Sequence, residues 1–431
     1  MTTKNETPTA SRRAFLKSTG VLGAGLCLGA GGTVKQAAAA PFFPRRENKE
    51  GPLHTFLTYS DDPATTIDVN LCLKGKSEHA TVYFDTVSRK GDKDAYAQKV
   101  DATYYSTPLE MLDRRAMHTA ALKGLQPDTT YYFMGGDHEG GYTDERSFRT
   151  LPGGNAPIRF IDGGDMNIGP RARKLLKWAG QQDPDFVVIG GDIPYANGLF
   201  AEYGDWIQWF KNWDEFMHCS DGRMIPMVTA VGNHEVNRYE SDNLYLRSPL
   251  YLSLFGRQSE APYYVRKFSN DVVMFLLDTD HLVPIEGAQT TWLEQEMAKY
   301  KDVKYKFASY HVPLYPTHRP YEGEASKAAR THWGPLFDTY GLTVGYEHHD
   351  HVFKRSKPLK GNQVVEKGRG TVYVGDGTFG VDPRTVDPQP RWYNEKEGSI
   401  AHFWVTDVRP EGLALKAIDE DGVEVDAFTL P

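Results

Sequence analysis

The sequence predicts an α/β protein of two domains, a small β-sandwich near the amino terminus and a larger domain in which helices flank a second β-sandwich. Three observations support this fold class. Between residues 50 and 152, short runs rich in β-branched and aromatic residues are typical of strands. From Ile158 onward, strand-like runs alternate with helical segments, the pattern of a layered α/β domain. The 431 residues, with ordinary apolar content, suffice for more than one core.

The first domain, residues 50–152, is expected to be of the fibronectin-III type. Its clearest strands are TIDVNLCL from residue 66, ATVYF from residue 80 and TTYYFMGG from residue 129. The segment GLQPDTTYYF, followed by SFRTLP, resembles the tyrosine corner of fibronectin-type sandwiches. His118 and His138 belong to no catalytic pattern, so we expect them on the surface or in loops.

The second domain, residues 156–431, has four segments with helical character, at 170–181, 203–216, 288–300 and 325–339. Aromatic residues between 206 and 216 recur at roughly helical spacing, which favours helix packing over a platform for substrate. Five continuous apolar runs are typical of strands buried on both faces. These runs are IRFI, DFVVI, PMVTAV, YKFAS and LTVGY, beginning at residues 158, 185, 226, 305 and 342.

A polar motif follows each of these five runs: GGDMN at 163, GGDIPY at 190, GNHE at 232, YHVPLY at 310 and HHDH at 348. Functional side chains in layered α/β folds collect on turns at strand ends. A lone Asp after Gly usually belongs to a turn or a helix cap, whereas five such motifs in this order indicate a metal centre. The expected ligands are Asp165, Asp192, Tyr195, Asn233, His311, His349 and His351.

These ligands combine carboxylate, phenolate, amide and imidazole groups without cysteine, a set too hard for a structural Cys-zinc site. A tyrosine bound to a strongly Lewis-acidic trivalent ion loses its proton easily, so we expect Fe(III) at one position. Two ions about 3.5 to 4 Å apart can clamp a phosphoryl group and lower the pKa of a bound water. The motifs therefore predict a two-metal hydrolase whose nucleophile comes from water.

At these motifs the chain resembles the purple acid phosphatases, within the calcineurin-like metallophosphoesterases. GGDIPY matches the family's G-D-x-x-Y, GNHE matches G-N-H-E, and YHVPLY matches the histidine motif that runs into V-P-L-Y. The other two motifs depart from the family pattern. Asn167 stands where G-D-x-G ends in glycine, and His348 stands where G-H-x-H begins with glycine. We expect His348 to lie behind the ligands or on the surface rather than to be an additional ligand.

The resemblance implies a metallophosphoesterase αββα sandwich, preceded by a fibronectin-III-like domain as in plant purple acid phosphatases. It implies one site for Fe(III) and one for a divalent ion, Fe, Zn or Mn, with Asp192 as the bridge. The Fe(III) site would comprise Asp165, Asp192, Tyr195 and His351. The divalent site would comprise Asp192, Asn233, His311 and His349.

The implied reaction is hydrolysis of a phosphomonoester by attack of metal-bound hydroxide, as in an acid phosphatase. His234 follows Asn233 directly and should point away from the metals, so its imidazole can meet the phosphate or protonate the leaving oxygen. His318 precedes the segment YEGE, where similar family members have a substrate histidine before an M-E-G-E-like segment. We expect these two histidines to be catalytic.

Two alternatives remain at this stage. A phosphodiesterase of the wider superfamily would use the same centre, although Tyr195 argues against it. A non-catalytic protein that binds phosphate or metal would follow if the altered first and last motifs had cost activity, although all seven ligands are present. The natural substrate, the divalent ion, the pH optimum and the oligomeric state are left open.

The amino terminus predicts export of a bacterial protein. Residues 11–17, SRRAFLK, form a twin-arginine signal, followed by an apolar stretch over 21–34 and small residues over 37–40. The apolar stretch is shorter than the roughly 20 residues of a membrane span, so we expect cleavage near Ala40 and no stable membrane anchor. The twin-arginine export machinery is the expected partner, and the mature protein should be periplasmic or secreted.

Charge and cysteine content limit the remaining classes. The chain carries a formal charge of −8 at pH 7, and its first 40 residues are net positive, so the rest is more acidic still. Such a balance disfavours nucleic-acid binding. Beyond residue 40 only Cys72 and Cys219 remain, in different predicted domains, so we expect no disulfide. The loop over 381–398 could lie over the site, and Arg384 or Arg391 could contact phosphate there, although a solvated loop is the simpler expectation.

Overall fold

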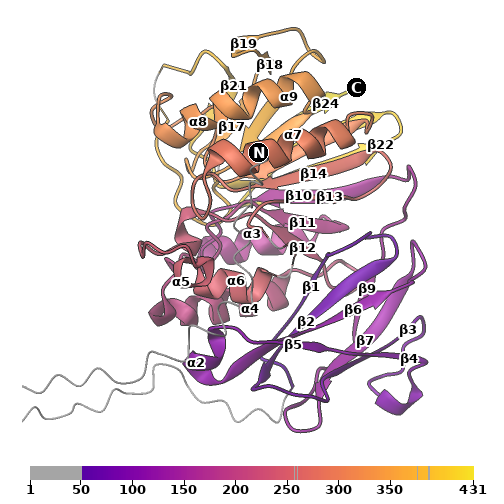
Figure 1. Ribbon diagram of the computed structural model, residues 1–431. Helices are drawn as coiled ribbons and strands as arrows, with labels where there is room; N and C mark the ends of the chain where they lie inside the picture. Colours follow the sequence, from indigo (N-terminus) through magenta and orange to yellow (C-terminus); the bar gives the residue numbers. More distant parts are fainter. Residues whose placement is uncertain (1–50, 257, 260, 376, 387–388) are drawn as a thin grey trace, which may run out of the picture.

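The computed structural model describes residues 51–431 except 257, 260, 376, 387 and 388. An all-β domain lies beside a larger domain whose two sheets are stacked between helices (Figure 1). The predicted signal over residues 1–40 lies outside the described residues, so export stays a prediction. None of the described helices combines the length and apolar character that crossing a bilayer requires.

The amino-terminal domain is a sandwich of two antiparallel sheets, as its strand-only sequence pattern predicts. The Tyr131 hydroxyl accepts a hydrogen bond of 2.9 Å from the Gln126 backbone N–H, which is the expected tyrosine corner. One sheet has the order β1 (His54–Thr58), β2 (Thr66–Lys74), β6 (Arg115–Lys123) and β5 (Thr103–Tyr105). The other has β4 (Gln98–Asp101), β3 (Thr81–Asp85), β7 (Thr130–Asp137) and β8 (Gly141–Tyr142), with β9 (Arg146–Arg149) also paired to β7. The short helices are η2 (Lys93–Ala95) and α2 (Leu109–Asp113).

The position predicted for His118 is wrong. Its side chain is buried in β6, where Nε2 accepts a hydrogen bond of 3.0 Å from the Ser77 backbone N–H. Burial lowers the pKa of His118, although the neighbouring carbonyl groups oppose this effect. A neutral histidine with a backbone partner is compatible with a strand interior, and composition alone does not distinguish it from a surface residue.

The larger domain contains two sheets with parallel centres. The five apolar runs predicted as strands all lie in them, as β10, β11, β12, β15 and β16. The first sheet has the order β12 (Met227–Thr229), β11 (Phe186–Ile189), β10 (Ile158–Gly163), β22 (His402–Arg409), β23 (Gly412–Asp419) and β24 (Glu424–Leu430). The second has β13 (Tyr264–Lys267), β14 (Val272–Leu277), β15 (Tyr305–Tyr310), β16 (Val344–Glu347), β20 (Val372–Gly375), β17 (Phe353–Ser356) and β21 (Asn394–Gly398). A small hairpin pairs β18 (Leu359–Lys360) with β19 (Gln363–Val364).

Helices cover the outer faces of both sheets. The aromatic residues of α4 are mostly buried against the first sheet, which agrees with helix packing rather than with a substrate platform. The helices near the first sheet are α3 (Pro170–Gly180), η3 (Phe200–Glu202), α4 (Tyr203–Phe216), η4 (Asn233–Glu235), α5 (Leu244–Arg247) and α6 (Pro249–Phe255). Those over the second sheet are η5 (Ile285–Gln289), α7 (Thr290–Lys299), α8 (Glu324–His332) and α9 (Gly334–Tyr340). The helix predicted over 325–339 is therefore two helices, because Gly334 and Pro335 interrupt it.

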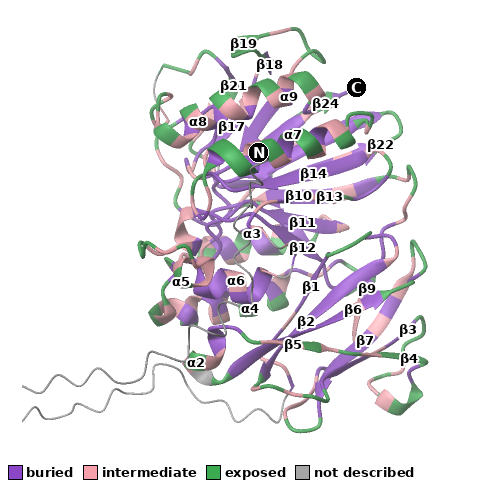
Figure 2. Ribbon diagram, in the orientation of Figure 1, coloured by how far each residue is buried: buried purple, intermediate pink, exposed green. Residues whose placement is uncertain are grey.

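The core follows these layers. Side chains from the facing sides of the two sheets form one cluster, including Phe160, Phe307 and Tyr346. The strands of the larger domain are almost continuously buried, whereas its helices alternate buried and exposed faces (Figure 2). This αββα arrangement is the predicted one. Cys72 and Cys219 are both buried, and no disulfide joins them to each other.

Aromatic residues of β1 join the two domains. His54 stacks on Phe210 of α4 with ring centroids 4.4 Å apart, and Phe56 packs against Phe210 and Phe255. Burial, together with the nearby charges of Arg115 and Lys211, lowers the pKa of His54 to about 3. The imidazole is therefore neutral at this apolar junction.

We expect the stability of the protein to fall with acidification through His54. Its folded-state pKa of about 3 lies below the ordinary 6.5, so below pH 6.5 the unfolded chain binds a proton that the folded chain does not. One pKa unit corresponds to about 1.4 kcal/mol, so this proton should cost about 2 to 3 kcal/mol between pH 6.5 and 4.5. Urea unfolding of wild type, His54→Phe and the exposed control His138→Phe at both pH values measures it. An equal loss in all three proteins would contradict this role.

Candidate metal centre

The predicted ligands follow the carboxyl ends of strands from both sheets. Strands β10 and β11 are parallel in the first sheet, and β15 and β16 are parallel in the second, so their ends meet at one edge of the sandwich. Five of the ligands have left-handed backbone conformations, which are rare for residues other than glycine. Clustered backbone strain of this kind is typical of functional sites. The five are Asp165, Asp192, Tyr195, His349 and His351.

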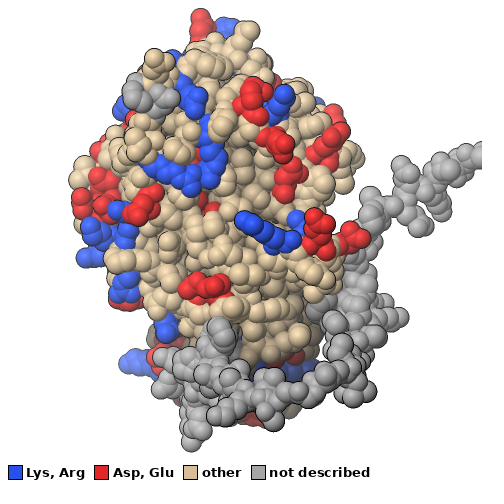
Figure 3. All heavy atoms as spheres, turned by 90° about the vertical axis from the view of Figure 1, so that its left-hand side faces the viewer, with Lys and Arg blue, Asp and Glu red and all other residues tan. Residues whose placement is uncertain are grey.

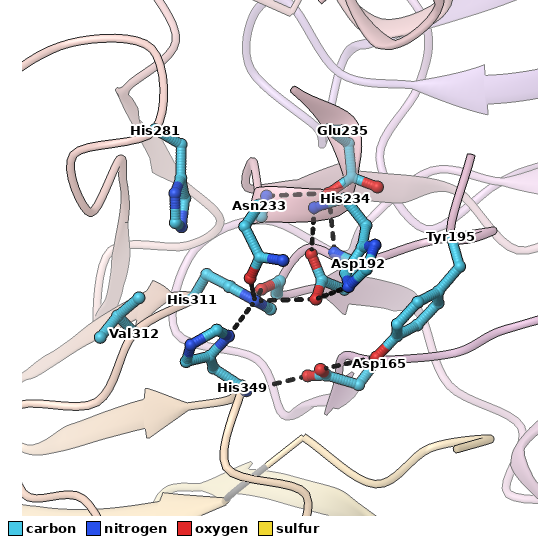
Figure 4. Close-up of polar contacts among 12 residues, drawn as sticks. Asp165, Asp192, Tyr195, Asn233, His234, Glu235, His281, His311, Val312 and His349 are labelled. Atoms are coloured by element: carbon cyan, nitrogen blue, oxygen red, sulfur yellow. Dashed lines mark hydrogen bonds and ion pairs between the residues drawn. The ribbon is translucent and has the colours of Figure 1, made fainter. Parts of the chain in front are cut away.

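One group of ligands converges on His311 Nε2. This atom lies 3.1 Å from each of Asp192 Oδ2, Asn233 Oδ1 and His349 Nδ1 (Figure 4). On the other side of the ring, Nδ1 donates a hydrogen bond of 3.0 Å to the Gly190 carbonyl. In a neutral His311, Nε2 would then point its lone pair at the Asp192 and Asn233 oxygens, which are themselves acceptors, while His349 Nδ1 donates or accepts according to its tautomer. A cation, either a proton or a metal ion, relieves the contact with the two oxygens.

A second group contains the phenol. Tyr195 Oη donates a hydrogen bond of 3.0 Å to Asp165 Oδ1 and lies 3.1 Å from His351 Nε2, which itself is 2.8 Å from Asp165 Oδ1. The Asp165 carboxylate also accepts the His349 backbone N–H at 2.9 Å. His349 therefore supplies its ring to one group and its backbone to the other, so the two groups adjoin. The seven ligands of both groups together form one site, the cradle.

The electrostatics of the cradle fit a bound cation. Burial alone would lower the pKa of His311, but Asp192 and Asp165 outweigh it and raise that pKa to about 9. Burial opposes ionisation of Asp165 as well, yet His311 and His351 lower its pKa below the ordinary range. Burial and both carboxylates raise the pKa of Tyr195. A positive charge is thus favoured between these groups, and a strongly polarising ion could ionise the phenol.

The structure brings all seven predicted ligands together in these two groups. Three of them, Asp192, His311 and His349, place ligand atoms within 4.8 Å of one another. The donor set, two carboxylates, one phenol, one amide and three imidazoles, suits first-row ions. Asn233 begins η4, directly after the turn that follows β12.

The two predicted catalytic histidines lie at different distances from the cradle. His234 is half-buried beside it: its ring centroid is 4.2 Å from that of Tyr195, its Nε2 is 3.8 Å from Asp192 Oδ2, and Nδ1 contacts Asn197 Oδ1. His318 is exposed, and its backbone N–H donates to Asp350 Oδ2 at 2.7 Å while Nδ1 bonds the Thr385 carbonyl at 3.1 Å. His318 is therefore tied to the loops around the site rather than to the ligands.

His348 is buried behind the ligands. Its Nε2 lies 3.3 Å from Asp162 Oδ1 and 3.4 Å from Ser309 Oγ. A methyl group on Gly190 would come within 1.8 Å of His348 Nε2, so the glycine of the GGDIPY motif leaves room for this imidazole. The histidine that replaces the family's glycine therefore fills space beneath the motif turns.

Sequence reasoning missed three residues that hold the ligand turns. Glu235 is buried and accepts backbone N–H groups of Gly232, Asp192 and Ile193 at 2.7 to 2.8 Å. Burial and the Asp192 charge raise the pKa of Glu235 to about 7. Its place in GNHE was the available signal.

The other two missed residues are Asp350 and Gly377. Asp350 is buried and accepts the His318 and Arg319 backbone N–H groups at 2.7 and 3.2 Å. Gly377 has φ +68°, and a Cβ there would come within 2.1 Å of Asp165 Oδ2, so only glycine fits. Asp350 stands inside HHDH, whereas nothing near Gly377 in the sequence indicated its contact with Asp165.

Two family models match the chain. The N-terminal domain of purple acid phosphatases matches residues 52–150, and the calcineurin-like phosphoesterase model matches residues 169–353. An uncharacterized protein of Mycobacterium tuberculosis is 27% identical over 324 residues, which cover 63% of this chain and 60% of that protein. The chain thus spans about 60% of the length of this relative. Purple acid phosphatase 21 of Arabidopsis thaliana is 25% identical over 378 residues, 84% of this chain and 78% of that protein.

Solved structures share the fold. Purple acid phosphatase PPD1 from yellow lupin (Lupinus luteus) seeds aligns with a TM-score of 0.73 at 19% identity, covering 89% of this chain and 75% of that one. The structure of PhoD aligns with a TM-score of 0.64 at 11% identity, covering 90% of this chain and 94% of that one. At such identities the likeness concerns the fold.

We expect Glu235→Gln to weaken metal binding with the fold intact. Glutamine keeps the shape but loses the acceptor charge that orients three backbone N–H groups around Asp192. Loss of such a supporting contact typically lowers metal affinity about 10- to 100-fold. Competition titration against a chelator measures the affinity, and circular dichroism checks the fold. The exposed Glu215→Gln on α4 is the control, and equal affinities in both variants would exclude this role for Glu235.

Proposed function

Because this chain belongs to the calcineurin-like phosphoesterases and carries the N-terminal domain of purple acid phosphatases, we propose that it hydrolyses phosphomonoesters with the help of two metal ions. The observation that carries the proposal is the convergence of two ligand groups on one cradle, joined by His349. Acceptor atoms crowd around His311 Nε2 there, and the phenol of Tyr195 lies in the adjoining group.

The metal assignment in this proposal follows the two groups. Asp165, Tyr195 and His351 would hold Fe(III), and Asn233, His311 and His349 would hold a divalent Fe, Zn or Mn ion, with Asp192 between them. When bound, such a pair supplies Lewis acidity and lowers the pKa of a coordinated water. The Gly190 carbonyl fixes the tautomer of His311, since it accepts the hydrogen bond from Nδ1–H and leaves the lone pair of Nε2 for a metal.

The histidines beside the cradle would handle protons and substrate. His234 is held by Asn197 on its Nδ1 and its ring lies tilted against that of Tyr195, so its Nε2 is the atom turned toward Asp192. From there it would bind a phosphate oxygen or protonate the leaving alcohol. His318, on the outer loop, would contact the leaving group.

We also propose that the protein acts outside the cytoplasm, on the strength of the twin-arginine pattern at residues 11–17.

The assignment of Tyr195 is tested by a visible spectrum. Purified protein should bind iron, show a broad tyrosinate-to-iron band and release phosphate from a chromogenic phosphomonoester. Tyr195→Phe should lose the band, because the phenolate that produces it is gone. Tyr251→Phe, which removes a buried hydroxyl away from the ligands, should keep it. A colourless, iron-free but active protein would remove Tyr195 as a ligand and favour a phosphodiesterase of the same superfamily.

The role of His234 is tested by separating metal content from turnover. We expect His234→Ala to lower kcat about 100- to 10,000-fold, the usual contribution of a general acid, with metal content unchanged. Metal analysis and steady-state assays on the same preparation measure both quantities. His218→Ala serves as the control, because this histidine lies just after α4 and its Nε2 bonds the Asp214 carbonyl. Loss of metal in His234→Ala would show that the residue holds the centre together instead.

A further inference from the structure

Three arginines, Arg319, Arg384 and Arg391, lie on the loops beside the cradle. Arg391 bonds the carbonyls of Thr317 and Arg319 at 3.1 and 3.3 Å, so it joins the loop after β15 to the loop that leads into β21. Arg319 and Arg384 come from these same two loops. On the face seen in Figure 3, which is the left-hand side of Figure 1, one group of Lys and Arg side chains lies in the upper half, with Asp and Glu side chains beside it. The chain as a whole carries a charge of −8.

Arg319 and Arg384 converge on one backbone atom. Nη1 of each donates a hydrogen bond to the carbonyl of His349, with a distance of 3.5 Å for Arg384. Arg319 also pairs with Asp350 at 3.0 Å. Within the described part of the chain, Arg384 forms no ion pair, and this long bond is the one hydrogen bond of its guanidinium. A guanidinium has five N–H donors, so most N–H donors of Arg384 bond to no residue that the structure describes.

Both arginines are anchored beside the centre, not within it. The backbone N–H of Arg384 donates to the His351 carbonyl at 2.7 Å. The two side chains thus touch the backbone carbonyl of His349, while the ring nitrogens of His349 and His351 contact His311 and Tyr195. Burial and the charge of Arg319 lower the pKa of Arg384, and Asp350 and Asp165 oppose this. Two guanidinium groups therefore lie close together on the His349 carbonyl, and Asp350 pairs with one of them, Arg319.

Two neighbouring guanidinium groups of this kind suit the binding of an oxyanion. Guanidinium groups bind phosphate and carboxylate through paired N–H donors, and these charge-assisted bonds are the strong ones. The phosphoryl group that reacts would lie among the ligand atoms, so an anion bound by the arginine pair would belong to another part of the substrate. Both side chains remain partly accessible, with about a third of the Arg319 side chain exposed.

We propose that Arg319 and Arg384 bind a second anionic group, a phosphoryl or a carboxylate, on the leaving group of the substrate. The enzyme would then prefer phosphoesters that carry two anionic groups over simple monoesters. This inference rests on the proposed function, because it names the substrate class of the same site. Arg391, whose guanidinium is bonded to two carbonyls, would instead hold the loops together.

Two matched pairs of substrates test the preference. Fructose 1,6-bisphosphate against fructose 6-phosphate adds a phosphoryl group, and 3-phosphoglycerate against glycerol 3-phosphate adds a carboxylate. The ratio of kcat/KM within each pair is measured for wild type, Arg384→Gln, the charge-keeping Arg384→Lys and the exposed control Arg369→Gln. We expect the wild-type ratio to favour the doubly anionic substrate and to fall at least about tenfold in Arg384→Gln. Arg384→Lys should keep most of it, and Arg369→Gln all of it.

The two pairs also separate the two chemistries. A preference confined to the first pair would assign the arginines to phosphoryl groups, and one confined to the second pair to carboxylates. An unchanged ratio in Arg384→Gln, or an equal loss on both members of each pair, would overturn the inference.

A protein that turns over none of the four substrates would refute the proposed function. Calorimetric binding of methylenediphosphonate against methylphosphonate, to wild type and Arg384→Gln, would then still decide whether Arg384 binds a second anion. Tighter binding of the diphosphonate that is lost in Arg384→Gln would support it, and equal binding would contradict it.

Discussion

The crowding of acceptor atoms around His311 Nε2 is the constraint on which the rest of the site depends. The other nitrogen of this imidazole donates to Gly190, so Nε2 faces a carboxylate and an amide oxygen with a lone pair unless a cation lies among them. Burial sharpens this requirement, because charges interact more strongly away from water. The chain therefore places a ring lone pair and two acceptor oxygens where they would repel one another without a positive charge.

Holding the ligand atoms together requires that the backbone turns that carry them keep their conformation. Five ligand residues have left-handed φ values, and each such residue is less stable than in an ordinary conformation. Buried carboxylates stabilise these turns: Glu235 binds three backbone N–H groups beneath Asp192, and Asp350 ties the loop at residues 318–319 to the segment of His349. His348 fills the space beneath the glycines of the same turns. The departure from the family motif at this position is thus compatible with the ligand geometry.

The outer loops and the amino-terminal domain act on this centre from two sides. The arginine pair places positive charge beside the ligands, because both guanidinium groups bond the His349 carbonyl. Burial, His311 and Arg319 lower the pKa of His349 and favour its neutral ring. The β1 aromatics pack on α4 and α6, the helices that cover the sheet carrying Asp165 and Asp192. The amino-terminal domain therefore supports the helical layer behind the site, and Arg319 and Arg384 come from loops that contact the segment of His349.

Strand runs, motif order and ligand types were fixed by the sequence alone, because apolar runs of four to six residues and chemically distinctive side chains are local properties. They were enough for the two-domain αββα class, for the tyrosine corner and for a list of seven ligands that the structure brings together. The tertiary structure alone decided the rest. The break at Gly334 is the exception, because the local Gly334–Pro335 pair causes it. The burial of His118, the bonds from Glu235 to the Asp192 turn, the contact of Gly377 with Asp165 and the convergence of Arg319 and Arg384 all depend on neighbours far away in the chain. Contacts of that kind leave no periodic or compositional trace, since they arise only when separate strands and loops meet in space.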